Sequence, residues 1–142
     1  MNSTTQLLAS MSKNVEMGVG TIDHIRELAT DPTFVDRLDD QYHRYQKLAG
    51  DIRSMQASYG CEKTSLSAME KWRTDMMIDM KTLMDKSDSH LAEMLTIGST
   101  MGVVAAIRNA HQYSDADKEA LALNERMQQA EEQHLHALKE FL

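Results

Sequence analysis

The sequence predicts an all-α protein: one antiparallel four-helix bundle with an additional crossover helix between the second and third core helices. Two observations lead to this fold class. Apolar residues recur at steps of three and four in each long segment, and no segment alternates as a strand does. With 142 residues, 42% of them apolar, six Gly and one Pro, the composition is that of a single helical domain over residues 1–142.

The N-terminal part predicts a hairpin of two helices, over residues 3–29 and 32–59. Asp31 can cap the second helix with Pro32 at its first position, and Gly60 can terminate it. The first helix carries an a/d seam, Leu8, Met11, Val15, Gly18, Ile22, Ile25 and Ala29. The inner face of the second contains Phe34, Val35, Leu38, Tyr42, Tyr45, Leu48, Ala49, Ile52, Met55 and Tyr59.

A further helix is predicted over residues 66–85, with Leu66, Met69, Trp72, Met76, Met80 and Leu83 on one face. At about 1.5 Å per residue it is long enough to carry the chain back along the bundle, which would make the second and central helices parallel. Cap-forming residues from Asp85 to Ser89 predict a break, after which Ser87 can start the central helix. The alternative is one continuous helix over residues 64–112, which would give a simple up-down bundle.

The segment 88–113 predicts the central helix. One stripe contains Leu91, Met94, Leu95, Gly98, Met101, Gly102 and Ala105, and the opposite side carries Ala92, Val103, Val104 and Ile107. A helix that is apolar on most of its circumference is typically covered on all sides, so we expect it inside the bundle. Ser114 is the predicted cap of the last helix, whose stripe is Ala116, Ala120, Leu123, Met127, Ala130, His134, Leu138 and Phe141.

Charge and cysteine content narrow the partners and the compartment. Fifteen Lys and Arg against 22 Asp and Glu give a net charge of −7, which disfavours nucleic acid and anionic membranes as partners. The single Cys61 allows no intrachain disulfide and fits a reducing cytoplasm. The N-terminal residues lack a signal-peptide pattern, and we expect no membrane-spanning helix because no run of about 18 apolar residues occurs. The expected location is cytoplasmic.

The side chains that could bind a metal ion lie in the C-terminal half of the sequence. Dinuclear metal sites in four-helix bundles take a Glu from each of two helices and a Glu-x-x-His from each of the others. Glu131 and His134 have this spacing within the last stripe. Counted back from the turn at residues 113–114, Glu93 lies at a similar height on the central helix, and His90 is one turn away. The candidate metal ligands are therefore Glu93, Glu131 and His134, with His90 as a further possibility.

The N-terminal half offers no matching set. Asp40 and His43 have the same spacing but lie on the face opposite the tyrosines, and at the expected height this hairpin presents Leu38, Tyr42, Ile22 and Ile25. A dinuclear site needs about four to six inward ligands, and only two or three are present. The simpler interpretation is that His134 is a core histidine paired with Glu131 or Glu93, because buried polar groups need partners. No catalytic or cofactor-binding set is identified.

The segments DKSDSHLAEM (85–94) and GSTMG (98–102) resemble uncharacterised bacterial members of the ferritin-like superfamily. The resemblance implies a ferritin-like four-helix bundle, and its classical members bind two irons to activate dioxygen or store iron. Because the site here is incomplete, we expect a non-catalytic packing or interaction module without a dinuclear site, and no cofactor. The alternative is a metal-binding (iron or another divalent metal) or redox protein that uses the half-site on the last two helices.

Excess apolar surface predicts self-association, most simply as a homodimer. The Val103, Val104 and Ile107 face would meet either the crossover helix or another subunit, and Met77 and Met84 add to the apolar surface. Twelve Met residues are also compatible with an adaptable surface for another protein partner.

Overall fold

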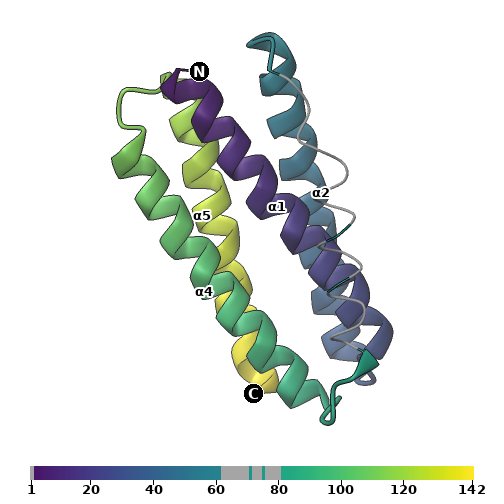
Figure 1. The fold of residues 1–142 in the computed structure, drawn as a ribbon. Coiled ribbons are helices and arrows are strands. Elements are labelled where there is room, and N and C mark those ends of the chain that lie inside the picture. Colours follow the sequence, from purple (N-terminus) through teal and green to yellow (C-terminus); the bar gives the residue numbers. More distant parts are fainter. Residues whose placement is uncertain (1, 62–70, 72–74, 76–80) are drawn as a thin grey trace.

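The computed structural model describes residues 2–61, 71, 75 and 81–142. The long helices are α1 (Ser3–Leu28), α2 (Pro32–Ser58), α4 (Asp88–Gln112) and α5 (Lys118–Leu138), and a short 3₁₀ helix, η1 (Lys139–Phe141), ends the chain. They pack side by side as a bundle (Figure 1). Within the described ranges there is no strand, so the predicted all-α four-helix bundle is confirmed.

The helix boundaries follow from local capping. Asp31 accepts hydrogen bonds from the backbone N–H groups of Thr33 and Phe34, and Pro32 occupies the first helical position, as predicted. Ser87 accepts from the N–H of His90, and residues 82–87 are not helical. The predicted break is therefore confirmed, and a continuous helix over 64–112 is wrong.

The start of α5 differs from the prediction. Its N-cap is Asp117 rather than Ser114, and residues 113–117 form a turn between α4 and α5. In this turn the N–H of Ala116 donates to the carbonyl of Tyr113, and the N–H of Asp117 donates to the hydroxyl of Thr4 on α1. The contact with α1 holds these residues outside the helix, a constraint that capping preferences alone do not reveal.

Polar contacts at the two ends of the bundle fix the direction of the helices. At one end the carboxylate of Asp88 accepts hydrogen bonds from the N–H groups of Thr30 and Asp31, at 2.9 and 2.8 Å. At the other end the hydroxyl of Tyr59 donates to Asp117. The beginnings of α2 and α4 thus share one end, so these helices run parallel, while α1–α2 and α4–α5 are antiparallel (Figure 1). The predicted crossover helix over 66–85 lies largely outside the described residues. Its predicted end is wrong, because residues 82–85 are described and are not helical.

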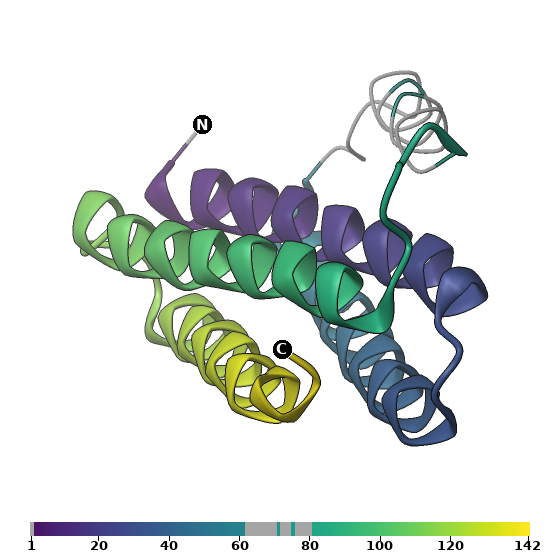
Figure 2. The same ribbon diagram turned by 90° about the horizontal axis from the view of Figure 1, so that it is seen from below.

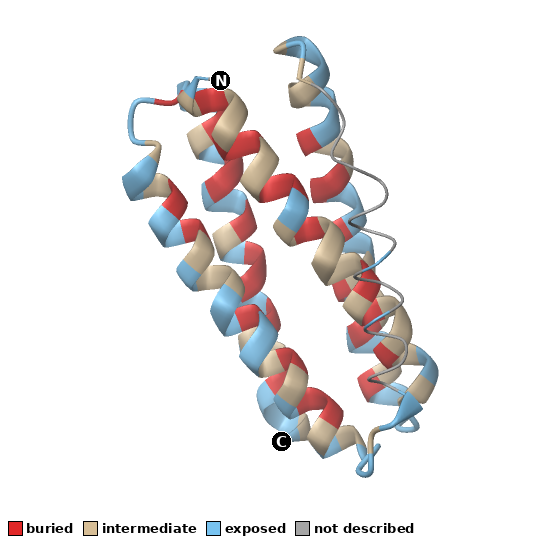
Figure 3. Ribbon diagram, viewed as in Figure 1, coloured by how far each residue is buried: buried red, intermediate tan, exposed pale blue. Residues whose placement is uncertain are grey.

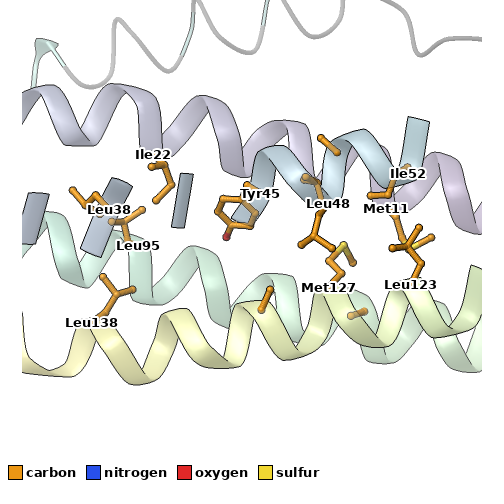
Figure 4. Packing of buried hydrophobic residues seen from close by; sticks show 14 of the residues in the cluster. Met11, Ile22, Leu38, Tyr45, Leu48, Ile52, Leu95, Leu123, Met127 and Leu138 are labelled. Carbon is orange, nitrogen blue, oxygen red and sulfur yellow. The ribbon is translucent and has the colours of Figure 1, made fainter. Parts of the chain in front are cut away.

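The helices form two layers. Figure 2 shows α1 and α4 side by side in one layer and α2 and α5 in the other. The buried apolar residues of all four helices meet between the layers, where Tyr45 lies in the middle of the core (Figure 4). The predicted seam of α1 is buried at Leu8, Met11, Val15, Ile22 and Ile25.

The expectation that α4 is covered on all sides is wrong. It buries Leu91, Ala92, Leu95, Ser99, Ala106 and Asn109. Its outer side leaves Ile97, Met101, Val104 and Ile107 exposed at 56, 67, 42 and 39%. Figure 3 shows exposed segments along α4. The reason is that α5 and α1 each cover one side of α4, and no described element packs against its third side.

The same apolar character makes α4 the one described helix that is long and apolar enough to cross a membrane by length and composition. Its most apolar window has a mean hydropathy of 1.4. The core helix of a soluble protein can meet the same criteria. The sequence-based exclusion of any such helix was therefore too strong.

Candidate functional site

Two of the predicted site residues meet in the core. Glu131 and His134, one helical turn apart on α5, both point inward and are buried. The His134 Nδ1 atom lies 3.7 Å from the Glu131 Oε1 atom. The two side chains are buried next to each other, as expected for a core pair, but no hydrogen bond joins them.

The main partner of Glu131 is a tyrosine from the facing helix. The hydroxyl of Tyr45 on α2 donates a hydrogen bond to Glu131 Oε1. The Tyr45 ring also meets the His134 ring edge-on, with 4.7 Å between centroids. Burial first, and then the charge of Glu131, raise the pKa of Tyr45 well above its usual value of 10, although a hydrogen bond with Ser99 on α4 acts to lower it. The phenol therefore remains a protonated donor at neutral pH.

The sequence predicted that Tyr42, rather than Tyr45, would lie level with Glu131 and His134 along the bundle. Tyr42 instead lies half-buried under Arg26, with the guanidinium carbon 4.0 Å from the ring centroid. The two tyrosines are less than one turn apart, so their periodicity does not distinguish which one faces α5.

Two glycines provide the space that the Tyr45–Glu131 pair occupies. A Cβ atom on Gly18 of α1 would lie 2.9 Å from Tyr45 Cζ. A Cβ atom on Gly102 of α4 would lie 2.9 Å from the carboxyl carbon of Glu131. Real Cβ atoms do not approach other atoms so closely, so larger residues at either position would displace the pair. Four helices thus contribute to this one buried site.

The structure does not bring Glu93 to this pair. The Glu93 side chain is 63% exposed and lies 3.8 Å from Nδ1 of His90, also on α4. Asp40 and His43 are exposed as well. Within the described part of the chain, no group of three or more His, Cys, Asp or Glu side chains converges as a metal site. The metal-binding role of Glu93, Glu131, His134 and His90 stays a prediction.

Glu93 does not lie level with Glu131 along the bundle because the turn between α4 and α5 is longer than predicted. Since α5 begins at Lys118 instead of near Ser114, Glu131 lies only about 13 residues into its helix. The part of α4 at this level is the segment around Ser99 and Gly102, as the contacts of these residues confirm.

His134 also borders the polar side of the bundle formed by α2 and α5. Its two ring nitrogens are buried and have no hydrogen-bond partner among the described residues. The amide nitrogen of Gln41 on α2, a buried residue that the sequence analysis did not single out, has none either. Both residues line a polar groove between α2 and α5, together with Arg37, Asp40, Arg44, Gln129, Glu132, Gln133, His136 and Ala137.

A second, mostly apolar pocket of about 290 Å³ lies between α1 and α4. Its walls come from both helices and include Val15, Met17, Ile22, Met94, Leu95 and Met101. Tyr45 and Glu131 belong to the other layer and therefore form its inner end. Sequence reasoning missed this pocket, although the three glycines that line it, Gly18, Gly98 and Gly102, were visible as gaps in two apolar stripes.

Comparison with models of known families, with curated proteins and with solved structures finds no match for this chain. The assignment of function therefore depends on the residues and geometry described above.

Proposed function

We propose that this chain is a non-catalytic interaction module that assembles as a homodimer through the exposed face of α4. The proposal includes a ferritin-like arrangement, in which a crossover helix that ends before residue 82 joins the parallel helices α2 and α4, and a cytoplasmic location. The observation that carries it is the exposed apolar stripe Ile97, Met101, Val104 and Ile107. A patch of this kind on a folded domain marks a contact surface.

The order of residues along this face favours a second copy as the partner. Glu93, Ile97, Val104 and Arg108 are exposed, and at 100° per residue they lie within one sector of the helix. They are placed symmetrically about the midpoint between Thr100 and Met101. In an antiparallel two-fold pair, Glu93 of each copy would therefore meet Arg108 of the other, and Ile97 would pack on Val104.

The charges at the ends of the stripe are available for such contacts. Arg108 forms no ion pair within the described part of the protein, and Glu93 has only the long contact with His90. An isologous interface requires a self-complementary patch, which an acidic residue at one end and a basic residue at the other provide. The net charge of −7 disfavours an anionic membrane as the alternative partner of the same face.

Light scattering coupled to size-exclusion chromatography tests the proposal. At tens of micromolar we expect a mass twice the 16.1 kDa of the monomer. Arg108→Glu should shift the protein to monomer, because two like-charge contacts replace two attractive ones, and adding Glu93→Arg should restore the dimer. Arg44→Glu, the same charge change at an exposed position on α2, is the matched control and should leave the dimer intact.

A monomeric wild type, or a dimer that Arg108→Glu leaves unchanged, would refute this interface. So would a monomer in solution that binds vesicles of phosphatidylcholine and phosphatidylserine through α4, because the face would then serve a membrane.

One observation favours metal binding as a second candidate function. Both ring nitrogens of His134 are buried beside Glu131 and have no hydrogen-bond partner among the described residues, and the Tyr45 hydroxyl donates to the same carboxylate. Imidazole, carboxylate and phenol are all ligands of iron, and a metal would satisfy the orphaned ring. Metal analysis of protein purified without a histidine tag, compared with His134→Leu, tests this candidate. Stoichiometric iron that disappears in the variant would favour it over the non-catalytic module.

A further inference from the structure

The pocket between α1 and α4 has a composition that specifies a ligand. Its walls are mostly apolar, and the acidic side chain of Glu131 is the only formally charged group among the described residues that line it. In the part of the chain that the structure describes, no Lys, Arg or His lines it. An apolar body with one positively charged end is the chemistry that complements such a lining.

The carboxylate lies where a ligand can meet it. One oxygen, Oε1, accepts from the Tyr45 hydroxyl, and the imidazole of His134 lies on this same side at 3.7 Å. The other oxygen, Oε2, lies beside Gly102, itself a lining residue of the pocket. Because Gly102 has no side chain, that oxygen lies close to the α4 backbone at the wall of the pocket. Tyr45 also holds the carboxylate in place, so the group is preorganised for a donor that arrives from the pocket.

A cationic ligand would also compensate an unfavourable feature of the core. A buried carboxylate is unfavourable unless it is neutralised or well hydrogen-bonded, and no Lys or Arg pairs with Glu131 within the part of the chain that the structure describes. The Thr21 and Ser99 hydroxyls, which line the same pocket, can serve as additional acceptors for an ammonium group.

The size of the pocket limits the ligand. About 290 Å³ is at the lower end of the range for small-molecule sites, enough for one ring or a short alkyl chain with a terminal amine. We propose that this pocket binds a small primary amine with an apolar body, whose ammonium group pairs with Glu131 at the inner end. The pocket shares Met101 with the exposed α4 stripe, but its inner end is formed by Tyr45 on α2 and Glu131 on α5.

The test uses 2-phenylethylamine as the probe, with 2-phenylethanol as its neutral analogue and 3-phenylpropionate as its anionic analogue. Calorimetric titration of the full chain should give one site for the amine, at least tenfold weaker binding of the alcohol and none of the carboxylate. In amide NMR spectra, the signals of Gly98, Ser99 and Gly102 should shift on addition of the amine. Glu131→Gln should remove the preference for the amine over the alcohol.

A pair of glycine variants gives a control that does not depend on altering the buried pair. A Cβ atom at Gly98 or at Gly50 meets no atom within 4 Å, so a side chain can begin at either position without a clash at its Cβ atom. Only Gly98 lines the pocket. Gly98→Leu should abolish amine binding, whereas Gly50→Leu on α2 should leave amine binding unchanged. Both variants should fold, because Leu has a higher helix propensity than Gly.

Three results would overturn the proposal: no binding of the amine at millimolar concentration, equal binding of amine and carboxylate, or full binding in Gly98→Leu. The Gly98→Leu arm remains decisive even if Glu131→Gln fails to fold.

Discussion

Removing the Tyr45 hydroxyl from the core tests how much its hydrogen bond to Glu131 stabilises the fold. Tyr45→Phe keeps the ring that packs on His134 but removes the donor to Glu131. A hydrogen bond to a charged group contributes about 1.5–3 kcal/mol, and the stranded carboxylate is buried. We expect a loss of about 2 kcal/mol in the free energy of unfolding, which lowers Tm by about 6 °C for a chain of this size.

Urea unfolding followed by circular dichroism is the assay, with the change in midpoint converted at constant m-value. Tyr42→Phe is the matched control, because Tyr42 lies on the same helix but its hydroxyl makes no hydrogen bond to the described residues. It should change stability by less than about 0.5 kcal/mol. If the two variants lose the same amount, the Tyr45–Glu131 hydrogen bond does not stabilise the fold and the reasoning fails.

A double-mutant cycle isolates the pair itself. Glu131→Met alone should also destabilise, because it leaves the buried Tyr45 hydroxyl without its main acceptor. The double variant, Tyr45→Phe with Glu131→Met, removes both polar groups, and replacing buried polar partners by apolar ones can be nearly neutral. We expect a coupling energy of at least about 1 kcal/mol. Additive losses would show that the two groups do not interact.

Three further predictions concern the ends of the bundle and its glycines. Burial acts to raise the pKa of Asp88, but hydrogen bonds from Thr30 and Asp31 outweigh it, so the pKa lies below 3.8. A lowered pKa stabilises the fold above the unfolded-state pKa, so the advantage of wild type over Asp88→Asn, about 1 kcal/mol at pH 7 by urea unfolding, should decline as the pH falls below 3.8. Gly102→Ala should lower the free energy of unfolding, because its Cβ atom would meet the Glu131 carboxyl group. Gly50→Ala, whose Cβ atom meets no other atom within 4 Å, should raise the free energy of unfolding by about 0.5–1 kcal/mol. Equal effects of the two variants would contradict the close approach of Gly102 to Glu131. Cys61→Ser should change stability by less than about 1 kcal/mol, since Cys61 is a free, partly buried thiol at the end of α2, and a loss of several kcal/mol in the same assay would contradict this.

The amino-acid sequence by itself determined most of the helices and the inward faces of three of them. Asp31 and Ser87 act on backbone groups within three residues, so their effect is readable from neighbouring positions. The α1 seam and the inward orientation of Glu131 and His134 likewise follow from helical periodicity, which fixes which residues share a face of one helix. These properties are local, and the structure confirms them.

Only the tertiary structure decided which faces meet. The α4 helix has apolar residues on several sides, so its composition could not reveal that one side would remain open. The level at which α4 faces Glu131 depends on the length of the turn at 113–117, which a contact with Thr4 on α1 helps to set. For the same reason Glu93 lies outside the site, while Tyr45 and two glycines lie within it. Periodicity gives the rotation of each residue about its own helix axis, but the relative rotation and shift of two helices are set by packing between residues far apart in the chain.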